Sequence, residues 1–581
     1  MAAMRCRSRW PLLAALTLAS CAQAPPPVAP PQTAGAASPA TPAATAPRCL
    51  SIVAWNDLHG QLSPDDPVID TGRVPAGGVA ALADQIAAVR ATGDAVVVLD
   101  AGDLFTGPLA STMAEGAPVI EAYRILGVDA AAFGNHEFDF GPAGYDAITA
   151  PPGVGDEAGA AGPRGALLAR MAAASFPFLS ANLHRKSGAE TGWPGHHAST
   201  RIQRDGFDVG VVGYTTQDTP TTTLKLNVAD LDFATGAAAR VAAAVRALRA
   251  AGSAPVVLLA HASLEGELPQ RIDDAADHKG EIATLMAELG PDLPDLIVAG
   301  HRHAWMVGKV RGVPIVSSDQ HGVGLSRIRY CRDGATPKLT EIERRVAMAT
   351  TPPRSALGVQ VAAAMAPWEA KVKAVAEAKV ATITRECAPK GLNGAAMGDQ
   401  IARATAERVT EAAPPPPGVP VVGLVNTGAL RAPLPAGLVH FGDLFTVIPF
   451  ENTIAACGTT RGGLLRFVEN AIKKDSARER FPFGISGAKV RLKRSADGRL
   501  TLLGLEIDGE KKGAPDDAPV WLALSDFMLF GGDALLSGVT CTPAATSQTR
   551  IREAWGALLG REQGTGAGAS CDGPAPNVKV E

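Results

Sequence analysis

Short apolar runs recur along the first 300 residues, and polar, glycine-rich clusters follow them. Five runs have the length of a buried strand: Leu50–Trp55, Val96–Asp100, Ala130–Phe133, Val256–Ala260 and Leu296–Ala299. Apolar runs this short, bounded by Gly, Asn or His, favour parallel strands that are covered on both faces. The pattern therefore predicts an α/β fold in which polar residues follow the carboxyl ends of five strands.

The clusters after these runs hold most of the chain's candidate chemistry. They are Asn56-Asp57-Leu58-His59-Gly60, Gly102-Asp103, Gly134-Asn135-His136-Glu137-Phe138-Asp139, Ala260-His261 and Gly300-His301-Arg302-His303. Ligands bind outside the carboxyl ends of strands in open α/β sheets, so we expect the clusters to meet at one rim. Five of the chain's eleven histidines fall in these clusters, which favours one functional site over scattered structural histidines.

The residue types indicate a site for two metal ions. Two cations roughly 3.5–4 Å apart can clamp the attacking and leaving oxygens of a phosphoryl transfer, and Asp103 is the candidate bridging carboxylate. Asp57 and His59 are two residues apart, so on extended backbone their side chains would point the same way, and the same holds for His301 and His303. Imidazole and carboxylate ligands together suit Zn, Mn, Fe or Co.

In its motifs and their order, the chain resembles the 5′-nucleotidase branch of the calcineurin-like metallophosphoesterases from about residue 49 to about residue 540. The resemblance implies an N-terminal β-sandwich of the four-layer type with flanking helices. It also implies two divalent cations, a metal-bound hydroxide that attacks phosphorus, and His136 assisting the leaving group while Asp139 orients its ring. One metal would be held by Asp57, His59, Asp103 and His303, and the other by Asp103, Asn135, His261 and His301.

The N-terminus is predicted to be a targeting segment rather than part of the fold. Residues 1–20 combine a basic start with a short apolar run, and Leu18-Ala19-Ser20-Cys21 resembles a bacterial lipobox with Cys21 as the lipidated residue. A plain secretory signal is the alternative. Residues 21–48 are rich in Ala and Pro and predict a flexible tether. We therefore expect a lipoprotein on the periplasmic side or the cell surface, with the outer membrane preferred.

Cysteine usage agrees with export. Of eight cysteines, Cys6 leaves with the signal and Cys21 takes the lipid, so six remain for disulfides. Cys49 and Cys331 flank the first and last strands expected in the N-terminal domain and are predicted to pair. Six cysteines allow fifteen pairings, and within the second domain the pairs that we expect are Cys387 with Cys457 and Cys541 with Cys571. The alternative is a few buried free thiols.

At 581 residues the chain is too long for one ordinary core, so we expect two domains. The metal domain is predicted to span 49–345. Residues 346–380 would form a linker in which a helix covers 354–380, because apolar positions recur there at helical spacing after Pro352-Pro353. A mixed α/β substrate domain would cover 381–575.

Three segments of this second domain extend the resemblance. They are Asn426-Thr427-Gly428-Ala429-Leu430-Arg431, Pro449-Phe450 and the loop from Asp526 to Asp533. The resemblance implies that Arg431 binds phosphate, that Phe450 and Phe527 sandwich the base, and that Asp533 contacts the sugar. Asn426 and Arg385 complete the expected substrate residues. The family turn usually has several glycines before its arginine, and this chain departs from it at Thr427–Leu430.

Together these features predict an exported phosphohydrolase that releases phosphate from nucleoside monophosphates. A UDP-sugar hydrolase or a 2′,3′-cyclic-nucleotide phosphodiesterase would use the same metal chemistry. A non-catalytic surface-binding lipoprotein is a remote alternative, because every expected ligand is present. The net charge of −4, without a long basic block, argues against a polymeric nucleic acid as partner. No obligate protein partner is evident, and membrane contact is expected through Cys21 alone.

Overall fold

The structure is a computed structural model that describes most of the chain after the predicted tether. The described residues are 49–65, 68–69, 72–144, 161–265, 271, 278–332, 334, 336–388, 395–474, 483–495, 499–511, 513–564 and 577–580. The predicted signal peptide, Cys21, the tether and Cys571 lie outside them. The domain boundaries given above stay predictions. We call the elements from β1 to β17 the N-terminal part and those from β18 to β27 the C-terminal part.

Two sheets form the N-terminal part. The first runs in the order β17 (Pro337–Val346), β16 (Gly324–Arg332), β1 (Cys49–Trp55), β4 (Ala95–Asp100), β5 (Ala130–Ala132), β6 (Phe178–Leu179) and β8 (His196–His197). The second runs β14 (Met306–Val310), β15 (Val313–Ser317), β13 (Leu296–Ala299), β12 (Val256–His261), β10 (Phe207–Thr215) and β9 (Ser199–Arg204). All five predicted strands are present. Their neighbours are mainly parallel, but they belong to two sheets rather than one.

The two sheets pack face to face, as the alternation along their strands shows. In β1, Ile52 belongs to a core shared by both sheets, whereas Val53 belongs to a core between the first sheet and its helices. In β12, Leu259 lies in the shared core and Leu258 in the core beneath the helices of the second sheet. Successive side chains of a strand point to opposite faces. The predicted four-layer fold, with helices outside two sheets, is therefore confirmed.

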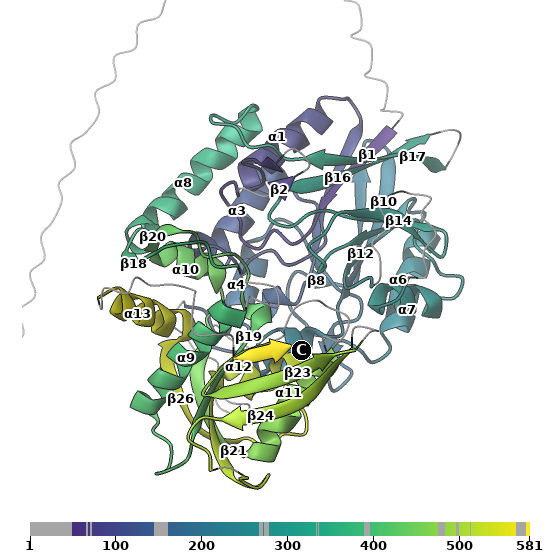
Figure 1. Ribbon diagram of the computed structural model, residues 1–581. Coiled ribbons are helices and arrows are strands. Elements are labelled where there is room, and N and C mark those ends of the chain that lie inside the picture. Colours follow the sequence, from purple (N-terminus) through teal and green to yellow (C-terminus); the bar gives the residue numbers. More distant parts are fainter. Residues whose placement is uncertain are drawn as a thin grey trace, which may run out of the picture. The chain divides into compact units, whose positions relative to one another are not determined.

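Helices cover the outer faces of both sheets (Figure 1). α6 (Ala237–Ala250) and α7 (Glu281–Glu288) lie on the second sheet. The first sheet carries α1 (Val79–Arg90), α2 (Leu109–Thr112), α3 (Ala117–Leu126), α4 (Gly165–Ala173) and α8 (Ala356–Ala376). α8 is the predicted linker helix. It starts where the Ser355 hydroxyl accepts a hydrogen bond from the Gly358 N–H, which satisfies one of the free amides of its first turn.

The remaining short elements of the N-terminal part are connections between these layers. The strands are β2 (Val68–Ile69), β3 (Gly72–Arg73), β7 (His184–Arg185) and β11 (Leu231–Asp232). The helical turns are α5 (Thr219–Thr222), η1 (His136–Phe138) and η2 (Lys225–Val228). η1 and α5 contribute residues to the site described below.

The C-terminal part is mixed α/β, as predicted. Its main sheet has the order β22 (Phe483–Ser486), β19 (Val421–Asn426), β25 (Pro519–Ser525), β21 (Thr453–Thr460) and β26 (Thr542–Arg550). Smaller sheets are β24 (Leu500–Ile507), β23 (Ala488–Arg494) and β27 (Val578–Val580), and the pair β18 (Lys379–Ile383) and β20 (Gly437–His440). The helices and turns are α9 (Ala395–Ala412), η3 (Thr427–Ala429), α10 (Phe441–Val447), α11 (Arg461–Lys474), α12 (Asp526–Leu529), η4 (Gly532–Ala534) and α13 (Ile551–Gly564).

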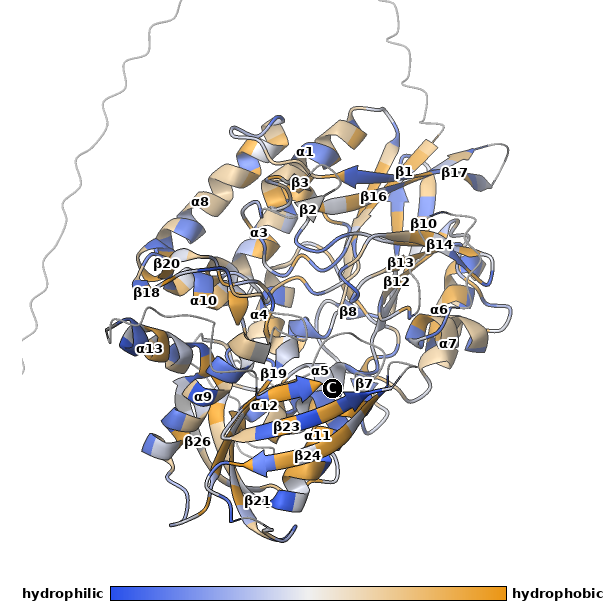
Figure 2. Cartoon of the chain, in the orientation of Figure 1, coloured by the Kyte–Doolittle hydropathy of each residue, from blue (hydrophilic) through white to orange (hydrophobic). Residues whose placement is uncertain are grey.

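Hydropathy separates the two faces of the small three-stranded sheet. β23 and β24 alternate between hydrophilic and hydrophobic residues in Figure 2. Val490 and Leu492 are buried in the core on one face, whereas Lys489 and Arg491 are exposed on the other. A two-residue period of this kind places one face of a strand on the core and the other in water. In the part of the chain that the structure describes, no helix is both long and apolar enough to cross a membrane.

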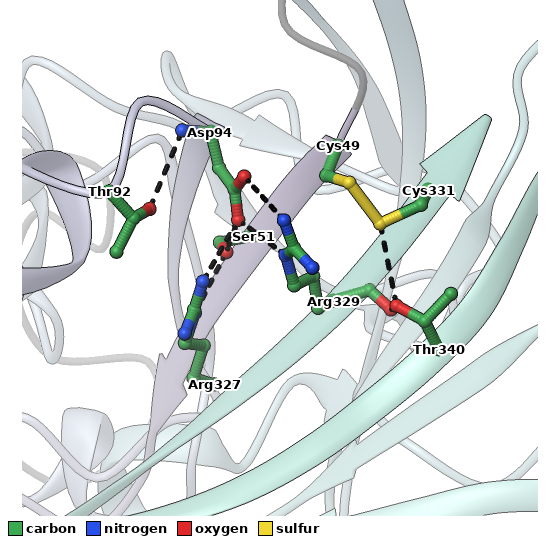
Figure 3. The surroundings of a disulfide bond; sticks show 8 residues. All are labelled: Cys49, Ser51, Thr92, Asp94, Arg327, Arg329, Cys331 and Thr340. Atoms are coloured by element: carbon green, nitrogen blue, oxygen red, sulfur yellow. Dashed lines mark hydrogen bonds and ion pairs between the residues drawn. A yellow bond between two sulfur atoms is a disulfide. The ribbon is translucent and has the colours of Figure 1, made fainter.

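The predicted disulfide between Cys49 and Cys331 is present (Figure 3). The two cysteines lie directly opposite each other on the antiparallel strands β1 and β16. Beside them, Asp94 accepts hydrogen bonds from Ser51, Arg327 and Arg329. Burial would raise the pKa of Asp94, but these donors lower it below its ordinary value. The covalent link and the ion pairs therefore tie β16 to the same end of β1.

The predicted pairs Cys387–Cys457 and Cys541–Cys571 are wrong, because Cys457 is bonded to Cys541. β21 and β26 are antiparallel neighbours, and Cys457 lies opposite Pro543 in their register. That register brings Cys541, just before β26, beside Cys457. Cys387 is disulfide-bonded as well, and its backbone pairs with that of Leu434.

Candidate functional site

The predicted metal ligands meet where the strands of both sheets end. Asp57 and His59 follow β1, Asp103 follows β4, and His301 and His303 follow β13. The potential ligand atoms form two groups, and within each group all of them lie within 4.8 Å of one another. The first group is Asp57, His59, Asp103 and His303, and the second is Asp103, His261 and His301. Asp103 belongs to both groups, so its predicted bridging position matches the geometry.

Distances between ligand atoms show how tightly the two groups are gathered. In the first, His303 Nε2 lies 3.0 Å from His59 Nε2 and 3.2 Å from Asp57 Oδ1. In the second, His261 Nε2 lies 3.0 Å from Asp103 Oδ2. Asn135, also predicted as a ligand, places its Oδ1 3.0 Å from His301 Nδ1. All seven predicted ligands are therefore brought together.

Three of the gathered atoms fit a bound cation because they make no well-aligned hydrogen bond, although two of them face each other in the Asp103–His261 ion pair. They are Asp57 Oδ1, Asp103 Oδ2 and His261 Nε2, and all three are buried. A buried polar atom without a partner costs about 1–3 kcal/mol, so such atoms rarely persist unless a ligand satisfies them. Carboxylate oxygen and imidazole nitrogen are the donor set expected for Zn, Mn, Fe or Co. These residues therefore fit a site for divalent metal.

In His59 and His261, a hydrogen bond at Nδ1 orients the ring so that Nε2 points into the site. His59 Nδ1 lies 3.1 Å from the backbone oxygen of Thr106, and His261 Nδ1 lies 2.8 Å from that of Ala101. A carbonyl oxygen can only accept, so each Nδ1 carries the proton. Each Nε2 is then left with its lone pair for a metal. Contacts of this kind commonly orient metal-binding histidines.

Left-handed backbone, not extended backbone, brings the ligands of the tight loops together. Asp57, His59 and Asp103 have φ of 52°, 49° and 61°, and His301 and His303 have φ of 76° and 53°. The expectation that extended backbone would align Asp57 with His59, and His301 with His303, is therefore wrong. Such conformations cost on the order of 1–3 kcal/mol per non-glycine residue. Five of them within one cluster indicate that the surrounding structure holds the loops in place.

Glu137 helps to hold these loops in their left-handed conformation, a role that was not predicted from the sequence. Its buried carboxylate accepts hydrogen bonds from the backbone N–H groups of Asp103, Leu104 and Gly134. Burial, and then the charge of Asp103, raises the pKa of Glu137 to about 7. Gly134 also has to be glycine, since a Cβ there would come within 2.1 Å of Asp103 Oδ1. The signal in the sequence was the position of Glu137 inside the Asn135–Asp139 motif.

Charge in the cluster is balanced among the protein's own side chains. Burial alone would raise the pKa of Asp103, but His261, and then His136, hold it well below its ordinary value. Burial alone would lower the pKa of His261, but Asp103 raises it to about 10. Asp103 and His261 therefore stabilise each other's charged forms. Because ligands bind a cation in their deprotonated forms, metal binding at these residues is expected to depend on pH.

His136 and Asp139 form the predicted dyad beside the metal ligands. His136 Nδ1 lies 2.7 Å from Asp139 Oδ2, and the three-residue step between them is spanned by η1. Burial lowers the pKa of His136, but Asp139 and then Asp103 outweigh it, so the pKa is raised. The remaining ring nitrogen, Nε2, is left to meet a substrate.

A cavity joins this dyad to the C-terminal part. From the N-terminal part it is lined by Asn135, His136, Asp139 and His301, among others, and from the C-terminal part by Asn426, Arg431, Phe450, Phe527 and Asp533. Phe450 stacks on His136 with ring centroids 5.4 Å apart. Asn426 donates to Asp533 over 2.7 Å. Five of the six predicted substrate residues therefore share one cavity with the dyad.

Arg431 reaches across this cavity to the metal ligands. Its Nη2 lies 3.3 Å from His59 Nε2 and 3.4 Å from His303 Nε2. The residues before it form η3, and Leu430 is fully buried in a core of the C-terminal part. The turn that departs from the family pattern is thus anchored by Leu430, and it directs Arg431 toward His59 and His303.

Arg385 is the substrate residue that the structure places apart. Its side chain is exposed, and it is not among the residues that line the cavity. Its assignment stays a prediction. Conversely, Thr222 and Thr223 line the cavity without having been predicted. They lie in a threonine-rich run with no recognisable motif, so the sequence offered no signal for them.

Comparisons with known proteins agree with this geometry. Residues 374–537 match the family described as 5′-nucleotidase, C-terminal domain. A snake venom 5′-nucleotidase of Gloydius brevicauda is 34% identical over 174 residues, which are 29% of this chain and 26% of that protein. Endonuclease YhcR of Bacillus subtilis is 26% identical over 434 residues, which are 73% of this chain and 32% of that protein. The matches thus span only about a quarter to a third of these relatives.

Solved structures extend the similarity to nearly the whole chain. The crystal structure of a 5′-nucleotidase precursor from Thermus thermophilus superposes with a TM-score of 0.71 at 20% identity, covering 92% of this chain and 99% of that one. Identity at this level shows the fold alone, and the fold includes both the N-terminal and the C-terminal part. Residues 374–537 thus match the 5′-nucleotidase C-terminal domain, and the chain is similar to 5′-nucleotidases in part of its sequence and in its fold.

Proposed function

We propose that this protein is a metal-dependent phosphohydrolase with two cations, and that it releases phosphate from nucleoside 5′-monophosphates. One observation supports this most: a guanidinium, an aromatic platform and the His136 dyad converge on the same cavity, next to the gathered metal ligands. An arginine pairs well with a phosphate through two parallel hydrogen bonds. A nucleobase gains about 1–3 kcal/mol from stacking on an aromatic ring.

The protein's own groups divide the work. Arg431, within 3.4 Å of the metal-ligand nitrogens, would bind the phosphate oxygens. Cations bound by the two ligand groups would supply positive charge to the phosphate and activate the attacking water. His136, held by Asp139, would donate its Nε2 proton to the departing sugar oxygen. Phe450, stacked on His136, would fix the nucleoside so that this oxygen lies near the imidazole.

The proposal includes an exported, lipid-anchored protein. Disulfides persist in oxidising compartments, and the structure holds Cys49–Cys331 and Cys457–Cys541. The proposed anchor, Cys21, lies outside the described residues. Detergent-phase partitioning of the protein from a bacterial host tests it: the wild type should enter the detergent phase and Cys21→Ala should not. A wild-type protein in the aqueous phase would contradict the anchor without bearing on the enzyme activity.

A phosphodiesterase is the second candidate, and one observation favours it. The relative that matches the longest stretch of this chain among those named here is called an endonuclease. Cleavage of a phosphodiester requires the same cations but a different leaving group. UDP-sugars and 2′,3′-cyclic nucleotides are the small substrates of this kind.

A hydrolysis screen that measures both released phosphate and remaining substrate separates the candidates, because cleavage of a diester leaves a monoester and frees no inorganic phosphate. Purified protein would be loaded separately with Zn, Mn or Co and offered AMP, UDP-glucose, 2′,3′-cyclic AMP, single-stranded DNA and p-nitrophenyl phosphate. Preference for AMP over p-nitrophenyl phosphate supports the 5′-nucleotidase proposal. Faster cleavage of a diester than of AMP would replace it by a phosphodiesterase.

A further inference from the structure

The His136–Asp139 dyad continues to a third side chain. Asp139 uses Oδ2 for His136 Nδ1, at 2.7 Å, and Oδ1 for the hydroxyl of Thr223, at 2.8 Å. The carboxylate can only accept, so Thr223 donates to it. The side chain of Thr223 is buried, with 1% of the residue exposed, although it borders the cavity. Both oxygens of Asp139 are thus occupied by donors from opposite sides.

Thr223 is itself held firmly. It follows α5, and its N–H donates to the backbone oxygen of Thr219. Four residues later, Asn227 donates through Nδ2 to the backbone oxygens of Phe138 and Asp139, at 2.8 and 3.2 Å. The buried guanidinium of Arg164 in turn donates to the Asn227 backbone oxygen at 2.7 Å. The segment from Thr219 to Asn227 therefore clamps the loop that carries the dyad.

We propose that Thr223 is a positioning residue for His136, acting through Asp139. This inference rests on the proposed function, because it assigns Thr223 a part in the protonation of the leaving group. The Thr223 hydroxyl fixes the plane of the Asp139 carboxylate. The carboxylate fixes the imidazole, so that Nε2 stays directed into the cavity. The Thr223 hydroxyl is taken up by Asp139, so the proposed role requires no contact with the substrate.

Physical reasoning defines the expected effect. Without the hydroxyl, the Asp139 carboxylate gains freedom to rotate about its Cβ–Cγ bond, and the imidazole is aligned for a smaller fraction of the time. Misalignment of a catalytic group lowers the rate of the chemical step and leaves substrate binding largely intact. We therefore expect kcat for AMP to fall about tenfold in Thr223→Val, with KM changing by less than about twofold.

Three variants separate positioning from general disruption. Thr223→Val removes the hydroxyl at nearly constant shape. Thr223→Ser keeps it and should restore kcat to near the wild-type value. Thr221→Val is the matched control, because among the described residues the Thr221 hydroxyl donates only to the Asp218 backbone oxygen of the same turn, at 2.9 Å. It should leave kcat unchanged. Thr223→Ala provides a second removal in case valine impairs folding.

A double-mutant cycle with His136→Ala is the decisive measurement. If Thr223 acts only through His136, then Thr223→Val should add no further loss in the His136→Ala background. An equal loss in both backgrounds would overturn the proposal. A lower metal content in Thr223→Val or Thr223→Ala would overturn it too, because the defect would then arise at the cations.

A readout without substrate keeps this inference distinct from the proposed function. In zinc-loaded, 15N-histidine-labelled protein, the His136 Nδ1 proton is identified by its loss in His136→Ala. Its resonance should shift or broaden in Thr223→Val and stay unchanged in Thr221→Val. If the signal changes but the enzyme hydrolyses no nucleotide, the proposed function fails and the inference is retained. The kcat measurements are then made with the ester that the wild type does cleave. Nucleotide hydrolysis with an unchanged signal would overturn the inference alone.

Discussion

The metal cluster and the substrate side of the cavity are built in different ways. Asp57, Asp103 and His261 are at most 1% exposed and lie where covered strands of two sheets end. Phe450 and Phe527 are partly exposed, and they lie on a loop and in the short helix α12 of the C-terminal part. A group that is buried, charged and bound to several neighbours tolerates little change. The comparison suggests that rate is set by the first region and selectivity by the second.

The largest expected effect follows from removing the shared carboxylate. Asp103→Asn should lower kcat/KM by about a thousandfold or more, about 4 kcal/mol of transition-state stabilisation, and should reduce the content of both metals. Metal analysis after dialysis and AMP turnover measure the two effects. Asp292→Asn, which breaks a surface ion pair with Arg246, is the matched control and should change neither. Two retained metals with near-normal turnover would contradict the bridging position.

His136 lies between the two regions, and its loss should separate metal binding from turnover. His136→Ala removes the proposed proton donor, so kcat should fall about 10²–10⁴-fold. Both metals should stay bound, because His136 is not among the gathered ligands. Activated aryl phosphates, whose leaving group needs less protonation, should lose less than AMP does. Loss of metal from this variant would instead assign His136 to the metal ligands.

The two phenylalanines test the selectivity region, and the structure makes their expected effects unequal. Phe527→Ala should weaken AMP hydrolysis about tenfold, mostly in KM, and spare p-nitrophenyl phosphate. Phe450 also stacks on His136 and lies 5.7 Å from the Arg431 guanidinium, so Phe450→Ala should impair both substrates. Phe441→Ala, near Phe445 in α10, is the control. Equal losses on both substrates from Phe527→Ala would assign that ring to packing rather than to base binding.

The smallest effect on activity is expected from the disulfide at the other end of β1. Cys49 and Cys331 are separated by 282 residues in the chain. Chain-entropy reasoning gives about 5 kcal/mol as the most that closing so long a loop adds to stability. Cys49→Ala with Cys331→Ala should therefore lower the midpoint of thermal unfolding, while metal content and kcat at low temperature stay unchanged. Calorimetry and a turnover assay on the same sample decide this.

A structural feature could be predicted from the sequence where it depends on residues that are close together in the chain. The five strands and their ligands follow from short apolar runs, and the structure confirms the strands and gathers the ligands. The division of those strands between two sheets could not be read, because strand order depends on contacts far apart in sequence. The same cause defeated the pairing of Cys457, whose partner is set by β26 lying beside β21. Left-handed φ at Asp57 and Asp103 also escaped, since nothing but tertiary packing enforces it.

The position of β1 also sets an order in time. Among the described strands β1 comes first, yet it lies between β4, which starts at Ala95, and β16, which starts at Gly324. In a chain that emerges from the ribosome or a membrane channel N-terminus first, one edge of β1 waits unpaired until almost three hundred further residues have appeared. Cys49 waits as a thiol for the same interval, and Asp57 waits for His303. The pairing of Cys49 with Cys331 and the assembly of the ligand groups therefore come late in folding.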